Sequence, residues 1–279
     1  MHSDATTDLP QHLTESAPAG RYADVNGLRL YYEIHGTGTP LVLLHGGLGA
    51  IHMFGPDLIH ALSLGHRVIA TDLQGHGRTA DIDRPLSVEH MADDIAALLK
   101  HLNIPRADVM GYSLGGGVAL QVAIRHPELV DRLVVVSTAI RRSAYYADIL
   151  AQQGQVTAEA AEWMKQTPMY QMYASIAPRP EDWPRLLQKI GEAMTVDFDY
   201  SEQVAGIGAT TLIVAGDADM FPPAHAVETF ALLGGGRQDG GWDGSGRPKS
   251  QLAILPGLTH YNIAVAPSLV TTVLAFLGA

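Results

Sequence analysis

A serine flanked at a fixed spacing by two glycines constrains this chain more than any other feature. Residues 111–115 are Gly-Tyr-Ser-Leu-Gly, and this G-x-S-x-G spacing is typical of a sharp turn that joins a strand to a helix and exposes the serine hydroxyl. The flanks fit, because residues 107–110 have the apolar character of a strand end and residues 116–125 that of a buried helix. The same pattern also fits a glycine-rich helix start with an ordinary surface serine, so the remaining chain has to decide.

Short apolar strands alternate with helical patterns along most of the chain. Strands are expected at residues 41–44, 67–71, 107–110, 132–137, 210–215 and 252–255. Ser87 can cap a helix over residues 88–102, and Asn26-Gly27 joins two alternating runs as the turn of a β-hairpin. This rhythm predicts an α/β fold, with a parallel sheet covered on both faces and ligands bound beyond the carboxyl ends of the strands.

The rhythm breaks between residues 141 and 200, where helical patterns and turn prolines occur without a convincing strand. A segment inserted at the carboxyl edge of the sheet is placed to act as a lid, and we expect a helical cap. The alternative is two or three packing helices whose methionines and tyrosines belong to the core. The chain then divides into a leader (1–20), a core (21–140 and 201–279) and the cap (141–200). Within the core, the glycine-rich residues 234–250 predict a mobile surface loop, which lacks the G-K-[ST] of a phosphate-binding loop.

A catalytic serine needs partners, because its hydroxyl is a weak nucleophile at neutral pH. It requires a histidine base, and that base requires an acceptor to fix its tautomer. Among 13 histidines, His260 is the one placed after the last expected strand. Two acids follow the strand at residues 210–215, and Asp219 is preferred to Asp217. The reason is that Asp217, directly beyond Gly216, is better placed to bond the amides of its own turn.

The oxyanion that forms when a serine attacks a carbonyl group needs preorganised N–H donors. The amide of Leu114, directly after the serine, can supply one of them. The second is expected from residues 45–49 (H-G-G-L-G), where glycines let bare backbone approach the substrate; Gly47 is preferred, with Leu48 in reserve. His45 is expected to brace this loop, and no spacing in the chain is typical of metal ligands.

Taken together, these segments resemble the α/β-hydrolase superfamily. Five motifs occur in order, each at a strand end: H-G-G at 45–47, D-L-Q-G-H-G-R at 72–78, G-Y-S-L-G-G at 111–116, G-D-A-D at 216–219 and G-L-T-H at 257–260. The resemblance implies an eight-stranded, mostly parallel sheet flanked by helices, with a helical cap over roughly residues 141–200. It also implies a catalytic triad of Ser113, Asp219 and His260, and an oxyanion hole made by Gly47 and Leu114.

The leading hypothesis is a serine hydrolase that cleaves carboxylic esters of small to medium, apolar substrates through an acyl-enzyme on Ser113. One alternative is a lactonase or carbon–carbon bond hydrolase that uses the same triad. Another is a receptor-like member that binds a ligand with little turnover. The side chains expected to line the substrate space are Leu48, Met53, Phe54, Tyr112, Met169, Tyr173, Met220 and Phe221.

Composition limits the expected partners. The formal net charge is -11, and no basic cluster offsets it, which argues against nucleic acid and anionic membrane surfaces. We therefore expect a small-molecule ester substrate and no cofactor, while the choice between monomer and homodimer stays open. The absence of cysteine excludes disulfides and thiolate catalysis and is compatible with the cytoplasm, where we expect the protein. The leader lacks the apolar run of a secretory signal, and no apolar run reaches the roughly 18 to 20 residues of a membrane span.

Overall fold

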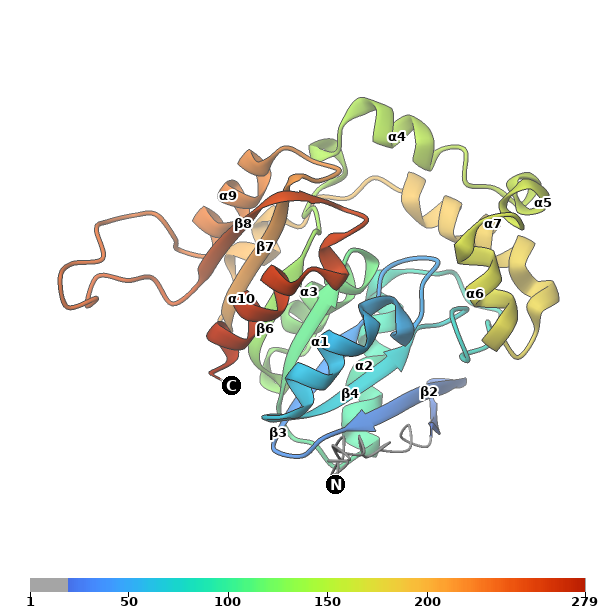
Figure 1. Cartoon of the computed structure of the whole chain (residues 1–279), viewed down its shortest axis with the longest axis horizontal. Helices are drawn as coiled ribbons and strands as arrows, with labels where there is room; N and C mark the ends of the chain where they lie inside the picture. Colours follow the sequence, from blue (N-terminus) through green and yellow to red (C-terminus); the bar gives the residue numbers. More distant parts are fainter. Residues whose placement is uncertain (1–19, 279) are drawn as a thin grey trace, which may run out of the picture.

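An eight-stranded sheet organises the computed structural model, which describes residues 20–278. Its strands are β1 (Arg21–Val25), β2 (Leu28–His35), β3 (Thr39–Leu44), β4 (His66–Asp72), β5 (Ala107–Tyr112), β6 (Val130–Val136), β7 (Thr210–Ala218) and β8 (Gln251–Thr259). They lie in the order β1-β2-β4-β3-β5-β6-β7-β8; the pairs β1/β2 and β2/β4 are antiparallel and the other pairs are parallel. The mostly parallel eight-stranded sheet is thus confirmed (Figure 1). All of the expected leader except Gly20 lies outside the described residues.

Helices cover both faces of the sheet (Figure 1). One face carries α1 (Gly55–Ser63) and α10 (Pro267–Leu277); the other carries α2 (Val88–His101), α3 (Leu114–Arg125), α8 (Ser201–Ala205) and α9 (Pro223–Leu232). Strand alternation explains the two cores, because Leu41 and Leu43 of β3 belong to the α1 and α10 side and Val42 and Leu44 to the other. All four side chains are fully buried, which is why β3 has a continuous apolar run. Within the described residues, no helix has the length and apolarity that crossing a membrane requires.

The hairpin expected at Asn26-Gly27 is confirmed. Both residues have positive φ angles, 49° and 78°, as the two central positions of a type I′ turn require. Val25 and Leu28 pair directly across this turn, so the turn sets the register of β1 against β2. The hairpin forms the antiparallel edge of the sheet.

Residues 141–199 leave the sheet after β6 and return before β7, and we call them the helical insertion. They contain α4 (Ala147–Gln153), α5 (Ala161–Met164), α6 (Pro168–Ile176) and α7 (Trp183–Thr195). An antiparallel bridge between Arg141 and Asp199 closes the base of the insertion. In Figure 1 its helices extend across the end of the sheet at which the parallel strands finish. Met164 and Tyr173 are buried inside it, as the alternative interpretation of plain core residues expected.

Residues 234–250 project from the body of the protein between α9 and β8 (Figure 1). Two side-chain turns organise them: Asp239 Oδ2 accepts from the amide of Gly241 at 2.9 Å, and Asp243 Oδ1 accepts from the amide of Ser245 at 3.0 Å. The side chain of Trp242 is fully exposed. The segment is a surface loop as expected, and its mobility stays a prediction.

Candidate active site

The glycines around Ser113 are required by close backbone contacts. A Cβ atom on Gly111 would lie 2.0 Å from the carbonyl oxygen of Gly115, and one on Gly115 would lie 2.2 Å from that of Leu44. Real Cβ atoms do not approach other atoms so closely, so any side chain would push α3 away from β5 and β3. The two glycines therefore seat the start of α3 directly against the sheet.

Ser113 occupies a strained turn between β5 and α3. Its φ angle is +54°, in the left-handed region that favours glycine, which costs on the order of 1–3 kcal/mol for other residues. Two hydrogen bonds hold Ser113 there. The Ser113 amide donates to the carbonyl of Val136 at 2.9 Å, and the Thr138 hydroxyl donates to the carbonyl of Ser113 at 3.0 Å. The turn points the Ser113 side chain into a polar cluster, so the ordinary surface serine does not describe this geometry.

The structure brings Ser113, His260 and Asp219 into one hydrogen-bonded line. His260 Nε2 lies 2.9 Å from Ser113 Oγ, and His260 Nδ1 lies 2.8 Å from Asp219 Oδ1. A carboxylate only accepts hydrogen bonds, so Nδ1 carries the proton and Nε2 is left to accept from the serine hydroxyl. The line joins residues that are 147 and 41 positions apart in the chain.

Asp219 is a buried carboxylate with several donors. The Ser137 hydroxyl donates to Oδ2 at 2.5 Å, the amide of Met220 donates to Oδ1 at 2.8 Å, and the amide of Gly216 donates to Oδ2 at 3.3 Å. Burial alone would raise the pKa of Asp219, but the hydrogen bond and charge of His260 and the donors Ser137 and Met220 hold that pKa below its ordinary value. Asp219 therefore stays ionised beside His260.

Asp219 faces His260 as expected, but the reason given for preferring it over Asp217 does not match the structure. Asp217 was expected to bond the amides of its own turn, but it is exposed and accepts from the amide of Gly257 on β8 at 2.8 Å. It is Asp219 that bonds the turn amides. The pairing of β7 with β8 shifts register between Gly216 and Ala218, beside the two acids.

Tyr112 contacts the histidine of the site. Its side chain is buried, its hydroxyl donates to the carbonyl of His260 at 2.5 Å, and the two rings lie 5.3 Å apart. Burial, with the charge of Asp219, raises the pKa of the Tyr112 hydroxyl, which therefore remains a donor. The contact with His260 occupies the polar end of Tyr112, and a contact of its ring with substrate stays a prediction.

The loop after β3 is braced by His45, as expected. The His45 side chain is fully buried; its Nδ1–H donates to the carbonyl of Gly46 at 2.7 Å, and its Nε2 accepts from the amide of Leu73 at 3.0 Å. Burial lowers the pKa of His45 to about 4, so it is neutral and can accept at Nε2. A Cβ on Gly47 would lie 3.8 Å from Leu114 Cβ, so the two expected oxyanion-hole residues face one another.

Three of the expected lining residues lie around this loop and the acid. Leu48 adopts a positive φ of 55° directly after Gly47. The half-buried Met53 lies over the loop, since a Cβ on Gly49 would meet its Cε at 2.4 Å. Met220, also half-buried, follows Asp219 and bonds it through its amide.

The other four expected lining residues pack in clusters or are exposed on the insertion. Phe54 is buried in the core beside α1, and Phe221 is buried against Tyr145. Tyr173 packs on Trp183 inside the helical insertion, and Met169 is exposed on α6. A role of these four side chains in lining the substrate space stays a prediction.

Sequence reasoning missed two residues that complete the site. Ser137, at the end of β6, contacts the acid, and nothing in its local sequence distinguishes it from other strand-end serines. Ile190 of α7 lies 3.7 Å from the position of a Cβ on Gly47. The helical spacing of Leu186 and Ile190 signals a buried face, but only the fold indicates what that face covers.

A cluster of ion pairs fastens α7 to the loop after β4. Asp81, whose side chain is 4% exposed, accepts from Lys189 Nζ at 2.6 Å and from Arg185 Nε at 2.8 Å. Gln74 Nε2 also donates to Asp81, at 2.8 Å, and a guanidinium nitrogen of Arg179 donates to its carbonyl at 2.6 Å. We call these five residues the Asp81 cluster.

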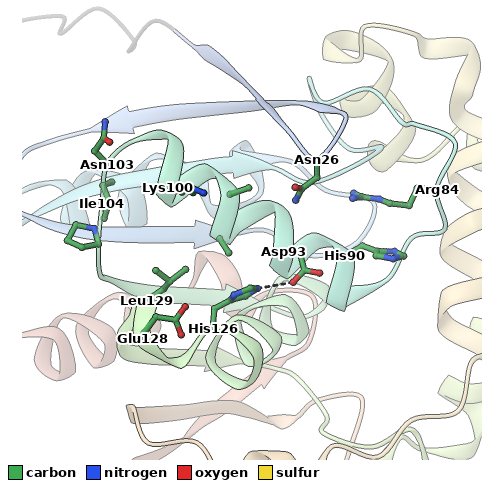
Figure 2. Close-up of a pocket in the computed structure, with 13 residues that line it drawn as sticks. Asn26, Arg84, His90, Asp93, Lys100, Asn103, Ile104, His126, Glu128 and Leu129 are labelled. Carbon is green, nitrogen blue, oxygen red and sulfur yellow. Dashed lines mark hydrogen bonds and ion pairs between the residues drawn. The ribbon is translucent and has the colours of Figure 1, made fainter.

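A hollow of about 1000 Å³ lies elsewhere, along the outer side of α2 (Figure 2). Figure 2 shows the ion pair of His126 Nε2 with Asp93 Oδ1, at 2.8 Å, beside it. None of Ser113, Asp219 and His260 is among its lining residues. Among the described residues, no three His, Asp or Glu side chains are grouped to hold a metal ion.

Comparison with known proteins places these features among hydrolases. The family model for the alpha/beta hydrolase fold matches residues 39–168. The proposed carbamate hydrolase RutD of Serratia proteamaculans is 30% identical over 223 residues, which are 72% of this chain and 83% of that protein. The enol-lactonase from Burkholderia xenovorans LB400 is 23% identical, with a TM-score of 0.68 over 93% of this chain and 100% of its own. A meta-cleavage product hydrolase from Pseudomonas fluorescens IP01 is also 23% identical, with a TM-score of 0.71 over 93% of this chain and 97% of that chain. The two structural likenesses concern the fold alone.

Proposed function

Because the chain belongs to the α/β-hydrolase superfamily, we propose that it is a serine hydrolase with Ser113 as nucleophile, His260 as base and Asp219 as the acid that orients the base. The observation that supports this most directly is the continuous hydrogen-bonded line from Ser113 Oγ through the imidazole to a buried carboxylate. Each member of such a line needs the next, since the serine is activated only by a neutral, correctly oriented imidazole.

The proposed reaction proceeds through an acyl-enzyme. Ser113 Oγ attacks the substrate carbonyl carbon while its proton moves to His260 Nε2. The amides of Gly47 and Leu114 stabilise the oxyanion, and a preorganised donor of this kind is typically worth about 10²–10³ in kcat. His260 then protonates the leaving alcohol. A water molecule, deprotonated by the same nitrogen, attacks the acyl carbon, so the ester bond to Ser113 breaks and the carboxylic acid leaves. Asp219 stabilises the imidazolium during both steps.

Carboxylic esters with small to medium, apolar acyl groups are the proposed substrates. Apolar side chains near the proposed oxyanion hole support this: Leu114 and Ile190 lie next to Gly47, and Met53 covers the neighbouring loop. A lactonase or a carbon–carbon bond hydrolase is the second candidate, favoured by the fold neighbours that carry those activities. Hydrolyses of esters, lactones and carbon–carbon bonds all begin with attack at an acyl carbon, so the turn at Ser113 does not distinguish them.

The test is pre-steady-state hydrolysis of p-nitrophenyl esters alongside lactones and ring-cleavage products. We expect a burst of p-nitrophenolate equal to the enzyme concentration, followed by slower turnover, with neither phase in Ser113→Ala. Asp217→Asn, a change in an exposed acid outside the hydrogen-bonded line, is the matched control and keeps the burst. Turnover of lactones or carbon–carbon substrates without ester turnover would favour the second candidate.

A receptor-like protein makes a different prediction. Ligand binding would raise the melting temperature equally in the wild type and in Ser113→Ala, and neither protein would release product. Turnover in the wild type alone excludes this alternative.

A further inference from the structure

Two aliphatic side chains lie next to Gly47, one of the proposed oxyanion-hole residues. Ile190 Cδ1 lies 3.7 Å, and Leu114 Cβ and Cδ2 each lie 3.8 Å, from the position of a Cβ on Gly47. These are ordinary van der Waals distances, so both side chains border that position directly. Leu114 belongs to the core, whereas Ile190 belongs to the helical insertion and is 3% exposed.

The position of α7 next to Gly47 is fixed by neighbours of Ile190. The preceding residue, Lys189, bonds the buried carboxylate of Asp81 and the carbonyl oxygens of Ile82 and Arg84 at 2.6 to 2.8 Å. One turn earlier, Leu186 approaches Gly75 in the loop after β4, with Cδ1 3.3 Å from the position of a Cβ on that glycine. An ionic contact and an apolar contact in the turn before Ile190 therefore hold its side chain in place beside Gly47.

We propose that Ile190 determines the length of the acyl group that the protein accepts. This rests on the proposed function, in which the substrate carbonyl oxygen is held between the amides of Gly47 and Leu114. The acyl substituent is attached to that same carbonyl carbon, so its first carbons meet the wall that Ile190 and Leu114 form. Ile190 contributes to this wall from the helical insertion, and its Cδ1 limits the length of the acyl chain that fits.

Truncating the side chain removes three carbon atoms from this wall. Each further methylene that the enlarged space accommodates raises kcat/KM about fourfold, the equivalent of about 0.8 kcal/mol for burial of one methylene. Room for roughly two further methylenes thus changes the preference between a long and a short acyl chain by more than about tenfold.

The experiment measures kcat/KM for p-nitrophenyl acetate, butanoate, hexanoate and octanoate. We expect Ile190→Ala to raise the ratio of hexanoate to acetate by at least about tenfold, and Ile190→Val, which removes one methylene, by about fourfold. Leu187→Ala is the matched control, because Leu187 is fully buried on the same helix. It is expected to lower the melting temperature without changing the chain-length ratio. An unchanged ratio in Ile190→Val and Ile190→Ala, or an equal change in Leu187→Ala, overturns the inference.

Alkylphosphonate p-nitrophenyl esters separate this inference from the proposed function. Ser113 Oγ attacks phosphorus, p-nitrophenolate leaves, and the phosphonyl adduct on Ser113 is detected by intact mass. Ser113-dependent ester turnover with an unchanged length ratio overturns the role of Ile190 alone. Adducts whose chain-length preference shifts in Ile190→Ala, without ester turnover, support the role of Ile190 and overturn the ester substrate. Absence of both turnover and adduct overturns both.

Discussion

Two buried histidines beneath the site predict that the protein loses stability in mild acid. His45 and His76 are both fully buried, and their rings lie 5.3 Å apart. Burial lowers the pKa of His45 to about 4; burial and then the proximity of His45 lower the pKa of His76 to about 3. His45 also accepts from the amide of Leu73 through Nε2, and this bond is lost when that nitrogen is protonated.

The sign and size follow from the difference between the folded and unfolded pKa values. Both folded values lie below the ordinary value of 6.5. The unfolded chain therefore binds protons first as the pH falls. The stabilisation is complete above about pH 6.5 and is lost as the pH falls from there toward the folded values. At pH 5 each histidine lowers the free energy of unfolding by about 2 kcal/mol, together about 4 kcal/mol, a large part of the ~5–15 kcal/mol typical of a domain.

The assay is urea unfolding, followed by circular dichroism at pH 7.5 and pH 5.0. The informative variant is His76→Asn, because the Asn amide can replace the Nδ1–H that donates to the carbonyl of Gln74 at 2.8 Å, and Nε2 has no hydrogen-bond partner among residues 20–278. We expect this variant to lose about 2 kcal/mol less than the wild type between the two pH values. His60→Asn, at an exposed position, controls for the substitution itself. Equal losses in the wild type and His76→Asn would refute the reasoning.

Three further predictions concern the site. Asp219→Asn should lower kcat by ~10⁴, by analogy with the serine-protease triad, whereas Asp217→Asn should leave it nearly unchanged; steady-state kinetics showing the reverse order would reassign the acid. Ser137→Ala removes a hydrogen bond to a buried carboxylate, about 1.5–3 kcal/mol, and should lower kcat by roughly 10- to 100-fold with little change in KM. It also removes one of the donors that hold the pKa of Asp219 below its ordinary value, and an unchanged kcat would contradict this positioning role. Asp81→Asn leaves the Lys189 charge without its carboxylate. We expect the free energy of unfolding to fall by less than the about 3–5 kcal/mol of a broken buried ion pair, because Lys189 keeps its carbonyl partners. Calorimetry that finds an unchanged melting temperature would show that the Asp81 cluster does not hold the insertion.

Local rules explain why so much of the fold was predictable. The turn at Asn26-Gly27 needs two residues that tolerate positive φ. The turn at Ser113 needs glycines where a Cβ would lie only 2.0 to 2.2 Å from a backbone oxygen. The apolar run of β3 requires burial on both faces. Residue types at neighbouring positions meet these demands, so a parallel sheet and the position of Ser113 follow from pattern alone.

The rest depends on contacts between distant segments. Asp219 and Asp217 have the same side chain two positions apart, but Asp219 bonds His260 whereas Asp217 bonds the amide of Gly257. Ser137 reaches the acid across 82 positions of the chain. The sequence thus determined the nucleophile turn and the sheet that presents it, because these obey short-range sterics and periodicity. Only the tertiary structure decided that Ile190 stands over Gly47 while Phe54 and Phe221 fill the cores, because packing between separate elements assigns side chains of equal hydrophobicity to different places.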